Sequence, residues 1–436
     1  MRPSKLLIWL SLALFLAGLC AAVTPLPGSL VILGLLLLLG VALIDVLCGL
    51  RPPRLKWTRN YQQRYALAHE TEVEGTLENR GRRRHTLRLY DGLPDHCKHD
   101  GFPYDLQLGA RQHATVQPRL TFTQRGDLRI TPAYVETRTP LALWWRASRV
   151  GTSQSIQIYP DYVPALNYGL LATADRVQQM GIIKKRSRGV SKEFHQLRDY
   201  HEGDALNVID WKASSRVNRL ISREFQEERD QKILLVADCS IRTRAVDTDL
   251  PILDHLLNAM ILISYMALNQ GDQVGIMNFG TRPKDYRYLA PVKGSHGMSK
   301  VLNHLYNYQS STSYGEYQAL AQRILATERK RSMIIILTNL RSEDQYGSVE
   351  ALRLLSQKHL VLLASVQESS ITQIIHDPIH TEEQADRYLG AQAYEQDAQH
   401  LVAALRDQGI SVLRSPLDSF AVTLANHYLD ARAGMS

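Results

Sequence analysis

The sequence predicts three structural parts in order along the chain: a pair of membrane-spanning helices, an all-β domain and a doubly wound α/β domain. Three observations support this prediction. Two long apolar runs fill most of the first fifty residues, and short alternating segments follow up to about residue 160. From residue 233 onward, apolar runs of strand length alternate with helical patterns. That last alternation is typical of a buried parallel sheet covered by helices.

The first fifty residues are predicted to form a transmembrane helical hairpin. The runs Leu6–Val23 and Leu30–Leu50 are apolar apart from Asp45, and each approaches the ~20 residues that a helix needs to cross a bilayer. A cleaved signal peptide is the alternative for the first run, but a second spanning run follows it at once. Asp45 is expected to snorkel or to hydrogen-bond the other helix, with an ion pathway as the alternative.

The charges around the hairpin predict that both chain termini face the cytoplasm. Arg2 and Lys5 precede the first run, Arg51 and Arg54 follow the second, and the connecting turn is uncharged. Residues 51–150 hold 18 Lys and Arg against 10 Asp and Glu, an excess equal to the net charge of +8 of the whole chain. Anionic membrane lipid is therefore a predicted partner. Nucleic acid is not, because no basic platform with interleaved aromatic residues is present.

Residues 57–160 predict a β-sandwich of immunoglobulin-like type, after a hairpin that ends near residue 56. Short segments with alternating apolar and polar residues are separated by Gly, Pro, Asn and Asp, which favour turns. The predicted strands are Glu70–Glu78, Thr86–Tyr90, Ala114–Thr123, Leu128–Val135 and Ser155–Tyr159.

Residues 233–436 predict the α/β domain with a mainly parallel sheet. Its expected strands are Ile233–Ala237, Gln273–Phe279, Met333–Leu337, Leu360–Val366 and one near Ile410–Leu413. Its expected helices are Leu250–Asn269, Gly297–Tyr308, Tyr317–Glu328, Ser348–Gln357, Ala393–Asp407 and Leu417–Leu429. Because the strands are apolar at nearly every position, both faces of the sheet should be covered.

The segment between these domains, 161–232, carries the most specific pattern of the chain. Its part from Phe194 to Glu228 interleaves Arg, Asp, Trp and Lys too closely for a simple amphipathic helix or alternating strand. The pattern runs LR-x-Y-x-x-GD, then IDW, then Arg, and its main residues are Arg198, Tyr200, Gly203, Asp204, Asp210, Trp211 and Arg216. In the order of these residues, the chain resembles the signature of the bacterial domain-of-unknown-function fifty-eight family.

The resemblance covers about residues 50–430 and implies a von Willebrand factor A-like fold for the α/β domain. It further implies an inner-membrane protein whose usual partner is a MoxR-type AAA+ ATPase, in a chaperone-like module that assembles other complexes. Transglutaminase-like membrane proteins are frequent companions of the family. The predicted function is therefore a non-enzymatic membrane adaptor. Two alternatives remain: a structural cell-envelope protein, and a hydrolase at the cytoplasmic membrane face, which would need His201, Asp204 and Asp210 in one cleft.

In A-like domains a loop reading Asp-x-Ser-x-Ser, a Thr and an Asp hold Mg²⁺. This chain keeps Asp238 and Ser240, has Arg242 at the third position, offers Thr312 in the second loop, and has Asn339 where a carboxylate is usual. A guanidinium repels a divalent ion, and the loss of a carboxylate removes a negative charge that would attract it, so both changes disfavour metal binding. We therefore expect Arg242 to pair with Asp238 in place of an ion. These five residues should then form a charged surface that binds a partner, with Mg²⁺ at Asp238, Ser240 and Thr312 as the weaker alternative.

The signature residues allow a structural and a functional interpretation. In the favoured one, their charged groups pair with one another and Trp211 packs as a wedge, attaching the segment to the edge of the α/β domain. In the other, the same residues line a docking or catalytic cleft. No catalytic residue or cofactor is predicted, since the sequence has no P-loop, no G-x-S-x-G and no H-E-x-x-H.

Overall fold

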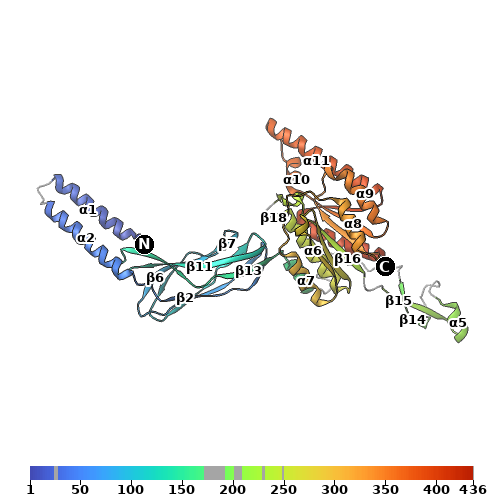
Figure 1. Cartoon of the computed structure of the whole chain (residues 1–436), viewed down its shortest axis with the longest axis horizontal. Helices are drawn as coiled ribbons and strands as arrows, with labels where there is room; N and C mark the ends of the chain where they lie inside the picture. The colour runs from blue at the N-terminus through green and yellow to red at the C-terminus, as the bar shows by residue number, and fades with distance from the viewer. Residues whose placement is uncertain (24–27, 171–191, 201–208, 228–230, 248–249, 436) are drawn as a thin grey trace. The chain divides into compact units, whose positions relative to one another are not determined.

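The structure is a computed structural model that describes residues 1–23, 28–170, 192–200, 209–227, 231–247 and 250–435 (Figure 1). The chain divides into two compact units, Met1–Tyr159 and Pro160–Ser436. The first contains two apolar helices and the β domain, and the second contains the α/β domain.

Two apolar helices begin the first unit. Helix α1 (Lys5–Val23) lies beside α2 (Gly28–Gly49), and both expose most of their large apolar side chains (Figure 1). By length and composition, the stretch Ser29–Gly49 could cross a membrane, and it is only 6% buried. Helix α6 (Ile252–Asn269) of the second unit passes the same test but is 78% buried. Helix α6 is therefore a core helix, whereas α2 exposes an apolar surface.

The β domain is built of three sheets whose strand pairs are antiparallel except for β13 with β3. The largest sheet has the order β1-β12-β11-β13-β3, with β6 paired to β11 and β8 paired to β6. Its strands are β1 (Arg2–Pro3), β3 (Arg64–Ala66), β6 (His85–Gly92), β8 (Tyr104–Leu108), β11 (Gly126–Arg138), β12 (Trp144–Val150) and β13 (Gln154–Tyr159). One smaller sheet has the order β2 (Leu55–Asn60), β5 (Glu74–Asn79) and β9 (His113–Val116). The other has the order β4 (Glu70–Glu72), β10 (Arg119–Phe122) and β7 (Cys97–Asp100).

The core of this domain lies between the largest sheet and the sheet of β2, β5 and β9. Trp57 and Leu77 of the smaller sheet share one buried cluster with Leu87, Leu89 and Val135 of the larger. Each predicted strand overlaps an observed one. The segment predicted as one strand from 114 to 123 is divided into β9 and β10, because Pro118 has no N–H to donate to a ladder.

Asp45 connects α2 to the turn between β11 and β12. Its fully buried carboxylate accepts hydrogen bonds from the Thr139 hydroxyl at 2.5 Å and from the backbone N–H groups of Leu141 at 2.9 Å and Leu143 at 3.1 Å. The expected helix–helix hydrogen bond or snorkelling is therefore wrong. The turn lies against the end of α2, and its backbone N–H groups at Leu141 and Leu143 are not used in strand pairing. The buried Asp45 carboxylate accepts their hydrogen bonds.

Two further hydrogen bonds attach the same helix end to β12. The Trp144 indole N–H donates to the Ala42 carbonyl at 3.2 Å, and the Arg146 guanidinium donates to the Gly49 carbonyl at 2.5 Å. A side chain at Gly49 would place its Cβ 2.6 Å from the Thr139 methyl group, so glycine permits this close approach. Strand β1 pairs with β12 immediately before α1 begins. Both helices are thus joined to one edge of the β domain.

The second unit contains a six-stranded sheet of order β20-β19-β16-β21-β22-β23. All neighbours are parallel except β20, which pairs antiparallel with β19 at the edge. The strands are β16 (Lys232–Asp238), β19 (Gln273–Phe279), β20 (Tyr288–Val292), β21 (Met333–Thr338), β22 (Leu360–Gln367) and β23 (Ser411–Pro416). The predicted buried, mainly parallel sheet is present.

Helices cover both faces of this sheet. Ile233 and Leu235 face a core with α3 (Val163–Leu170), α6, α7 (Ser295–Leu305) and α12 (Leu417–Met435). The alternate residues Leu234 and Val236 face a second core with α8 (Tyr317–Thr327), α9 (Gln345–Ser356) and α11 (Glu382–Asp407). A short helix, α10 (Ser369–His376), precedes α11. Two complete apolar faces explain why the strands are apolar at consecutive positions.

Two elements differ from the prediction. Strand β20 was not expected, and it includes Pro291, which an edge strand tolerates because one side needs no ladder hydrogen bond. Helix α3 belongs to the core of the second unit through buried Ala165, although residues 161–232 were predicted as a linker segment. The first residues of that segment therefore form part of the α/β domain.

Candidate functional site

The carboxyl end of β16 carries a buried carboxylate with three donors. Asp238 accepts hydrogen bonds from the Ser240 backbone N–H at 2.9 Å, from the Thr338 hydroxyl at 2.6 Å and from the Arg242 guanidinium at 3.3 Å. Asp238 and Thr338 end the neighbouring parallel strands β16 and β21. Because the carboxyl ends of parallel strands meet at one edge of a sheet, side chains a hundred positions apart come together.

Arg242 is a buried cation between two carboxylates. It lies in the 3-10 turn η3 (Ile241–Arg244), and its side chain is 5% exposed. Besides the predicted ion pair with Asp238, which is present, its guanidinium contacts Asp344 at 2.7 Å and donates to the Gly315 carbonyl at 3.0 Å. Its Cζ also lies 5.5 Å from the centre of the Tyr317 ring. We call Asp238, Arg242, Thr338 and Asp344 the Arg242 cluster.

The two acids of this cluster compete for one guanidinium. The pKa of Asp344 is raised to about 6, chiefly by burial; the charge of Arg242 opposes the shift, and the charge of Asp238 adds to it. Burial also raises the pKa of the Tyr317 hydroxyl, which lies 3.3 Å from the Thr338 hydroxyl. The cluster therefore takes up a proton more readily than an exposed ion pair does.

Four of the five residues predicted to bind a partner are buried. The exposed fractions are 0% for Asp238, 0% for Ser240, 5% for Arg242 and 2% for Asn339, whereas Thr312 is exposed. A loop covers them: Ser311 N–H donates to the Cys239 carbonyl at 2.7 Å, and Ile241 N–H donates to the Ser313 carbonyl at 3.0 Å. The predicted charged surface is corrected on this point, because the buried residues support the loops and do not form their outer face.

The cluster also contains residues that sequence reasoning missed. Thr338 supplies the hydroxyl expected from Thr312, and Asp344 supplies the second carboxylate. The signal for Asp344 was the acidic pair Glu343-Asp344 a few residues after an apolar strand. Asn339, expected in this site, instead donates to Glu368 at the end of β22. Nothing in the sequence pattern indicated the ring of Tyr317.

The donor set does not fit a magnesium ion. Among the residues that the structure describes, no group of three or more His, Cys, Asp or Glu could hold a metal. The Arg242 guanidinium occupies the space between the Asp238 and Asp344 carboxylates and forms ion pairs with both. A divalent cation would have to displace a charge that these side chains already use.

Beside the cluster lies a cleft of about 390 Å³, which we call the cationic cleft. Its lining includes the exposed residues Arg282, Lys284 and Arg287, with Asp285 as their acidic neighbour. Ser310, Ser311 and Thr312 also line it. Three cations with one carboxylate and several hydroxyl groups form an environment suited to a carboxylate ligand.

The signature residues lie mainly in a hairpin with a short helix. Strands β14 (Lys192–Asp199) and β15 (Ile221–Glu227) pair antiparallel, and α5 (Trp211–Val217) lies between them in sequence. Asp210 accepts from the Ala213 N–H at 3.0 Å and so caps α5. Arg198 lies in β14, the Tyr200 N–H donates to the Leu220 carbonyl, and Gly203 and Asp204 lie outside the described residues.

Trp211 does not pack as the predicted wedge, because its side chain is 66% exposed. Helix α5 instead buries Ser214, whose hydroxyl accepts from the Ile221 N–H at 2.9 Å and donates to the Asp210 carbonyl at 2.8 Å. Arg216 is exposed. An exposed ion pair joins Arg219 and Asp199 at 3.1 Å. The cap by Asp210 and the hydrogen bonds of Ser214 therefore connect α5 to β15.

Residues 196–378 match the model of a family described as "Protein of unknown function DUF58". The similarity to this family covers less than half of the chain. The matched range contains most of the signature hairpin, and all of the Arg242 cluster and the cationic cleft. No curated protein matches the chain.

Solved structures similar to parts of the chain show low similarity. The VWA domain of SpRpn10 is 10% identical with a TM-score of 0.30, over 47% of this chain and 97% of that one. *E. coli* alpha-2-macroglobulin is 12% identical with a TM-score of 0.20, over 24% of this chain and only 7% of its own length. The CARDB domain of PF1109 from *Pyrococcus furiosus* is 16% identical with a TM-score of 0.18, over 24% and 94%.

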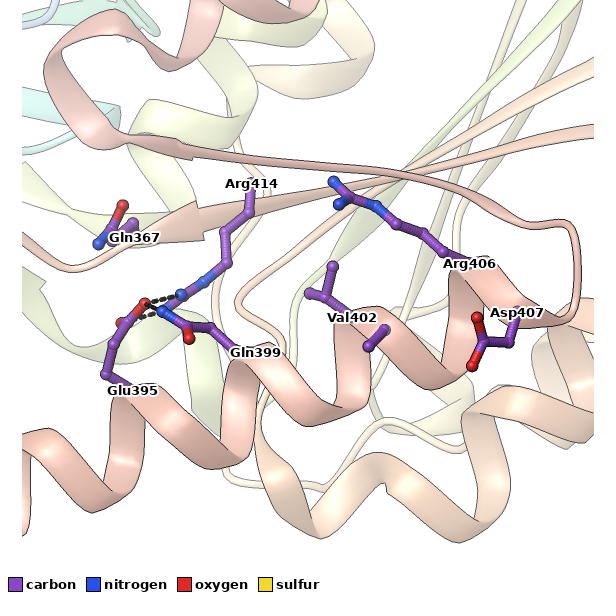
Figure 2. Close-up of a pocket in the computed structure, with 8 residues that line it drawn as sticks. Gln367, Glu395, Gln399, Val402, Arg406, Asp407 and Arg414 are labelled. Atoms are coloured by element: carbon purple, nitrogen blue, oxygen red, sulfur yellow. Dashed lines mark hydrogen bonds and ion pairs between the residues drawn. The ribbon is translucent and has the colours of Figure 1, made fainter.

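A larger cavity lies mostly beyond the matched DUF58 range, beside α11 and β23. It measures about 440 Å³, and Figure 2 shows Glu395 and Arg414 pointing toward each other across it. Their ion pair includes a contact of 2.8 Å, and both side chains are largely buried. Burial alone would raise the pKa of Glu395, but hydrogen bonds from Arg414 hold this pKa below its usual value. Because these charges satisfy one another, the cationic cleft is the better candidate for binding.

Proposed function

We propose that the protein is a non-enzymatic membrane adaptor whose α/β unit docks a partner protein. In this proposal α1 and α2 cross the bacterial inner membrane as a hairpin, with both termini in the cytoplasm. The exposed apolar side chains of α2 and the cations that flank both helices, such as Arg2 and Arg54, support this orientation. The β domain would be an immunoglobulin-like sandwich that carries the docking unit on the same side.

We further propose that the α/β unit is von Willebrand A-like. Its support is the strand order, with β16 central, β19 beside it and one antiparallel edge strand, β20. The loop that follows β16 has the expected order Asp238-x-Ser240, and it lies at the edge where parallel sheets commonly bind ligands. The β domain has two sheets packed on a shared core, which supports a sandwich.

The observation that carries the proposal is the charge arrangement at this edge. Arg242 pairs with both buried acids, Asp238 and Asp344, inside the loops, while Arg282, Lys284 and Arg287 are exposed. The edge therefore presents positive charge without needing a metal ion. Complementary charge gives specificity and fast association, so an acidic surface on the partner is expected.

The partner we propose is a MoxR-type AAA+ ATPase, in a chaperone-like module that assembles other complexes. This follows from the family resemblance, which also suggests a transglutaminase-like membrane protein as a companion. An adaptor that holds an ATPase at the membrane needs no nucleotide site of its own. The absence of a P-loop from the sequence is consistent with that division of roles.

Co-purification from native membranes, with and without ATP, tests the proposal. The site variant is Arg282→Glu with Lys284→Glu, which reverses two charges of the cationic cleft. The matched control is Arg329→Glu with Lys330→Glu, which reverses two exposed charges before the amino end of β21, at the opposite edge of the sheet. We expect the native protein and the control to recover an ATPase and the cleft variant to lose it. Recovery of no ATPase by the native protein overturns the partner, and equal recovery by the cleft variant overturns the site.

The hydrolase alternative receives no support from the described residues. Asp210, one of its three required residues, caps α5 through its carboxylate. His201 and Asp204 lie outside the described residues. The adaptor therefore remains the function that the geometry supports best.

A further inference from the structure

Three guanidinium groups surround one indole at the base of the helical hairpin. The Cζ atoms of Arg138, Arg88 and Arg2 lie 4.8, 5.7 and 5.9 Å from the centre of the Trp145 ring. These arginines come from β11, β6 and β1, and in the sheet Trp145 of β12 stands opposite both Arg138 and Arg2. We call these four residues the Trp145 cluster.

The Trp145 cluster is fixed beside the end of α2. The residues on either side of Trp145 both bind that helix: Trp144 through the Ala42 carbonyl and Arg146 through the Gly49 carbonyl. Helix α1 begins two residues after the end of β1, at Lys5. The apolar stretch of α2 ends at Gly49. The cluster therefore lies at the level where a membrane-crossing α2 would leave the hydrocarbon, which is where tryptophan and arginine favour the interface.

The cluster has a surplus of positive charge. Glu136 pairs with Arg2 at 2.5 Å and Asp105 pairs with Arg88 at 2.7 Å, which leaves three cations for two acids. The hydrogen bond from Arg88 lowers the pKa of Asp105, and the charge of Arg138 lowers it further. Arg138 is exposed, and the Arg2 side chain is 54% exposed. A guanidinium stacked on an indole keeps its N–H edge available for an oxyanion.

We propose that the Trp145 cluster binds the phosphate of an anionic glycerophospholipid in the leaflet at the base of the hairpin. This site rests on the membrane anchoring proposed above and gives it lipid specificity. The indole occupies the interfacial region, and the guanidinium of Arg138 donates to the phosphate oxygens. A zwitterionic lipid carries its own ammonium group, which the surrounding arginines repel.

The test titrates phosphatidylglycerol and phosphatidylcholine into the full chain in detergent and counts bound lipid by native mass spectrometry. The site variant is Arg138→Gln. The control is Arg149→Gln, because Arg149 also stacks on an aromatic ring, Tyr134 at 5.2 Å, but four residues further along β12, ~13 Å away. We expect the native protein and the control to bind phosphatidylglycerol at least about tenfold more tightly than phosphatidylcholine, and Arg138→Gln to lose most of that preference.

Two results overturn the inference: equal binding of both lipids by the native protein, or equal preference in the two variants. A third arm adds inorganic phosphate. Complete displacement of the lipid by phosphate means that the site accepts a small anion, which also overturns it. Alkaline extraction of native membranes separates this failure from failure of the anchoring. A protein that resists extraction yet shows no lipid preference loses only the lipid site, whereas one that is extracted loses the anchor.

Discussion

Asp45 and Asp238 are fully buried carboxylates in different units, and they are satisfied by different chemistry. Asp45 accepts only neutral donors, two backbone N–H groups and the Thr139 hydroxyl, all from one turn. Asp238 accepts one backbone N–H, the Thr338 hydroxyl and the Arg242 guanidinium. The neutral donors need no further partners. The guanidinium has more N–H donors than Asp238 accepts from, and Asp344 and the Gly315 carbonyl take up others.

Because of this difference, the Asp45 site is a local connection between two elements, whereas the Arg242 cluster connects several. The Asp45 site joins one helix end to one turn, so its loss should affect only that junction. The Arg242 cluster joins β16, η3, β21 and the 3-10 turn η5 (Ser342–Asp344), and each of its charges depends on the others. Removing one charged group leaves another buried without its partner. This lowers the unfolding free energy more than the loss of a neutral hydrogen bond does.

The largest effect is expected from Arg242→Met, which leaves two buried acids without their cation. We expect the second unit to lose ~3–5 kcal/mol of unfolding free energy. Denaturant titration of the full chain in detergent measures the loss. Arg244→Met is the control, because Arg244 is exposed in the same 3-10 turn. Equal stability of the two variants would contradict the assignment of Arg242 as the central charge.

A smaller and local effect is expected from Asp45→Ala. It leaves the backbone N–H groups of Leu141 and Leu143 without this acceptor, and the Thr139 hydroxyl with only the Trp144 carbonyl at 3.1 Å, which should cost ~2–4 kcal/mol at the junction. Hydrogen exchange should accelerate at residues 139–144 and stay unchanged in the second unit. Asp45→Asn is the graded control, because its amide oxygen still accepts. Slow exchange at the turn in Asp45→Ala would show that the junction does not depend on the carboxylate.

The stability of the Arg242 cluster should also depend on pH. The pKa of the Asp344 carboxyl is raised to about 6 in the folded chain. Between pH ~4 and about 6 this carboxyl is therefore protonated in the folded chain and ionised in the unfolded chain. Its contribution to stability is therefore complete below pH ~4 and is lost as the pH rises through about 6, on the order of 2 kcal/mol. Unfolding free energies at pH 4.5 and 6.5 should show this decline in the native chain and not in Asp344→Asn. The same slope in both chains would exclude Asp344 as its source.

The smallest effect is expected from Thr338→Val, which removes one hydroxyl donor to Asp238 and keeps the charges. We expect a loss of ~1–2 kcal/mol. Thr327→Val is the control, since Thr327 is exposed and its hydroxyl bonds only its own helix at the Arg323 carbonyl. Thermal unfolding of both variants measures the difference. A loss as large as that of Arg242→Met would mean that geometry, and not charge, dominates the cluster.

The sequence predicted elements whose pattern is local. Strands such as Ile233–Ala237 are recognisable because both faces are apolar. The pairing of Arg242 with Asp238 was predicted because Arg242 stands at a ligand position of the Asp-x-Ser-x-Ser loop, and it is present. The burial of that pair could not be predicted, because the covering residues Ser311 and Ser313 lie about seventy positions away. The same holds for Asp45, whose partners are 94 to 98 residues further along. The exposure of Trp211 depends on a cap and on Ser214, which no periodicity shows.

The three hydrogen-bonded connections at the end of α2, through Asp45, Ala42 and Gly49, have a mechanical consequence. A flexible tether would let the β domain swivel on the bilayer surface. Rigid attachment makes the helices and the β domain one lever, so a change in helix tilt moves the far end of the β domain in proportion to its length. In a hairpin that crosses the membrane as proposed, bilayer thickness influences helix tilt and would thereby change how far from the membrane that end is held.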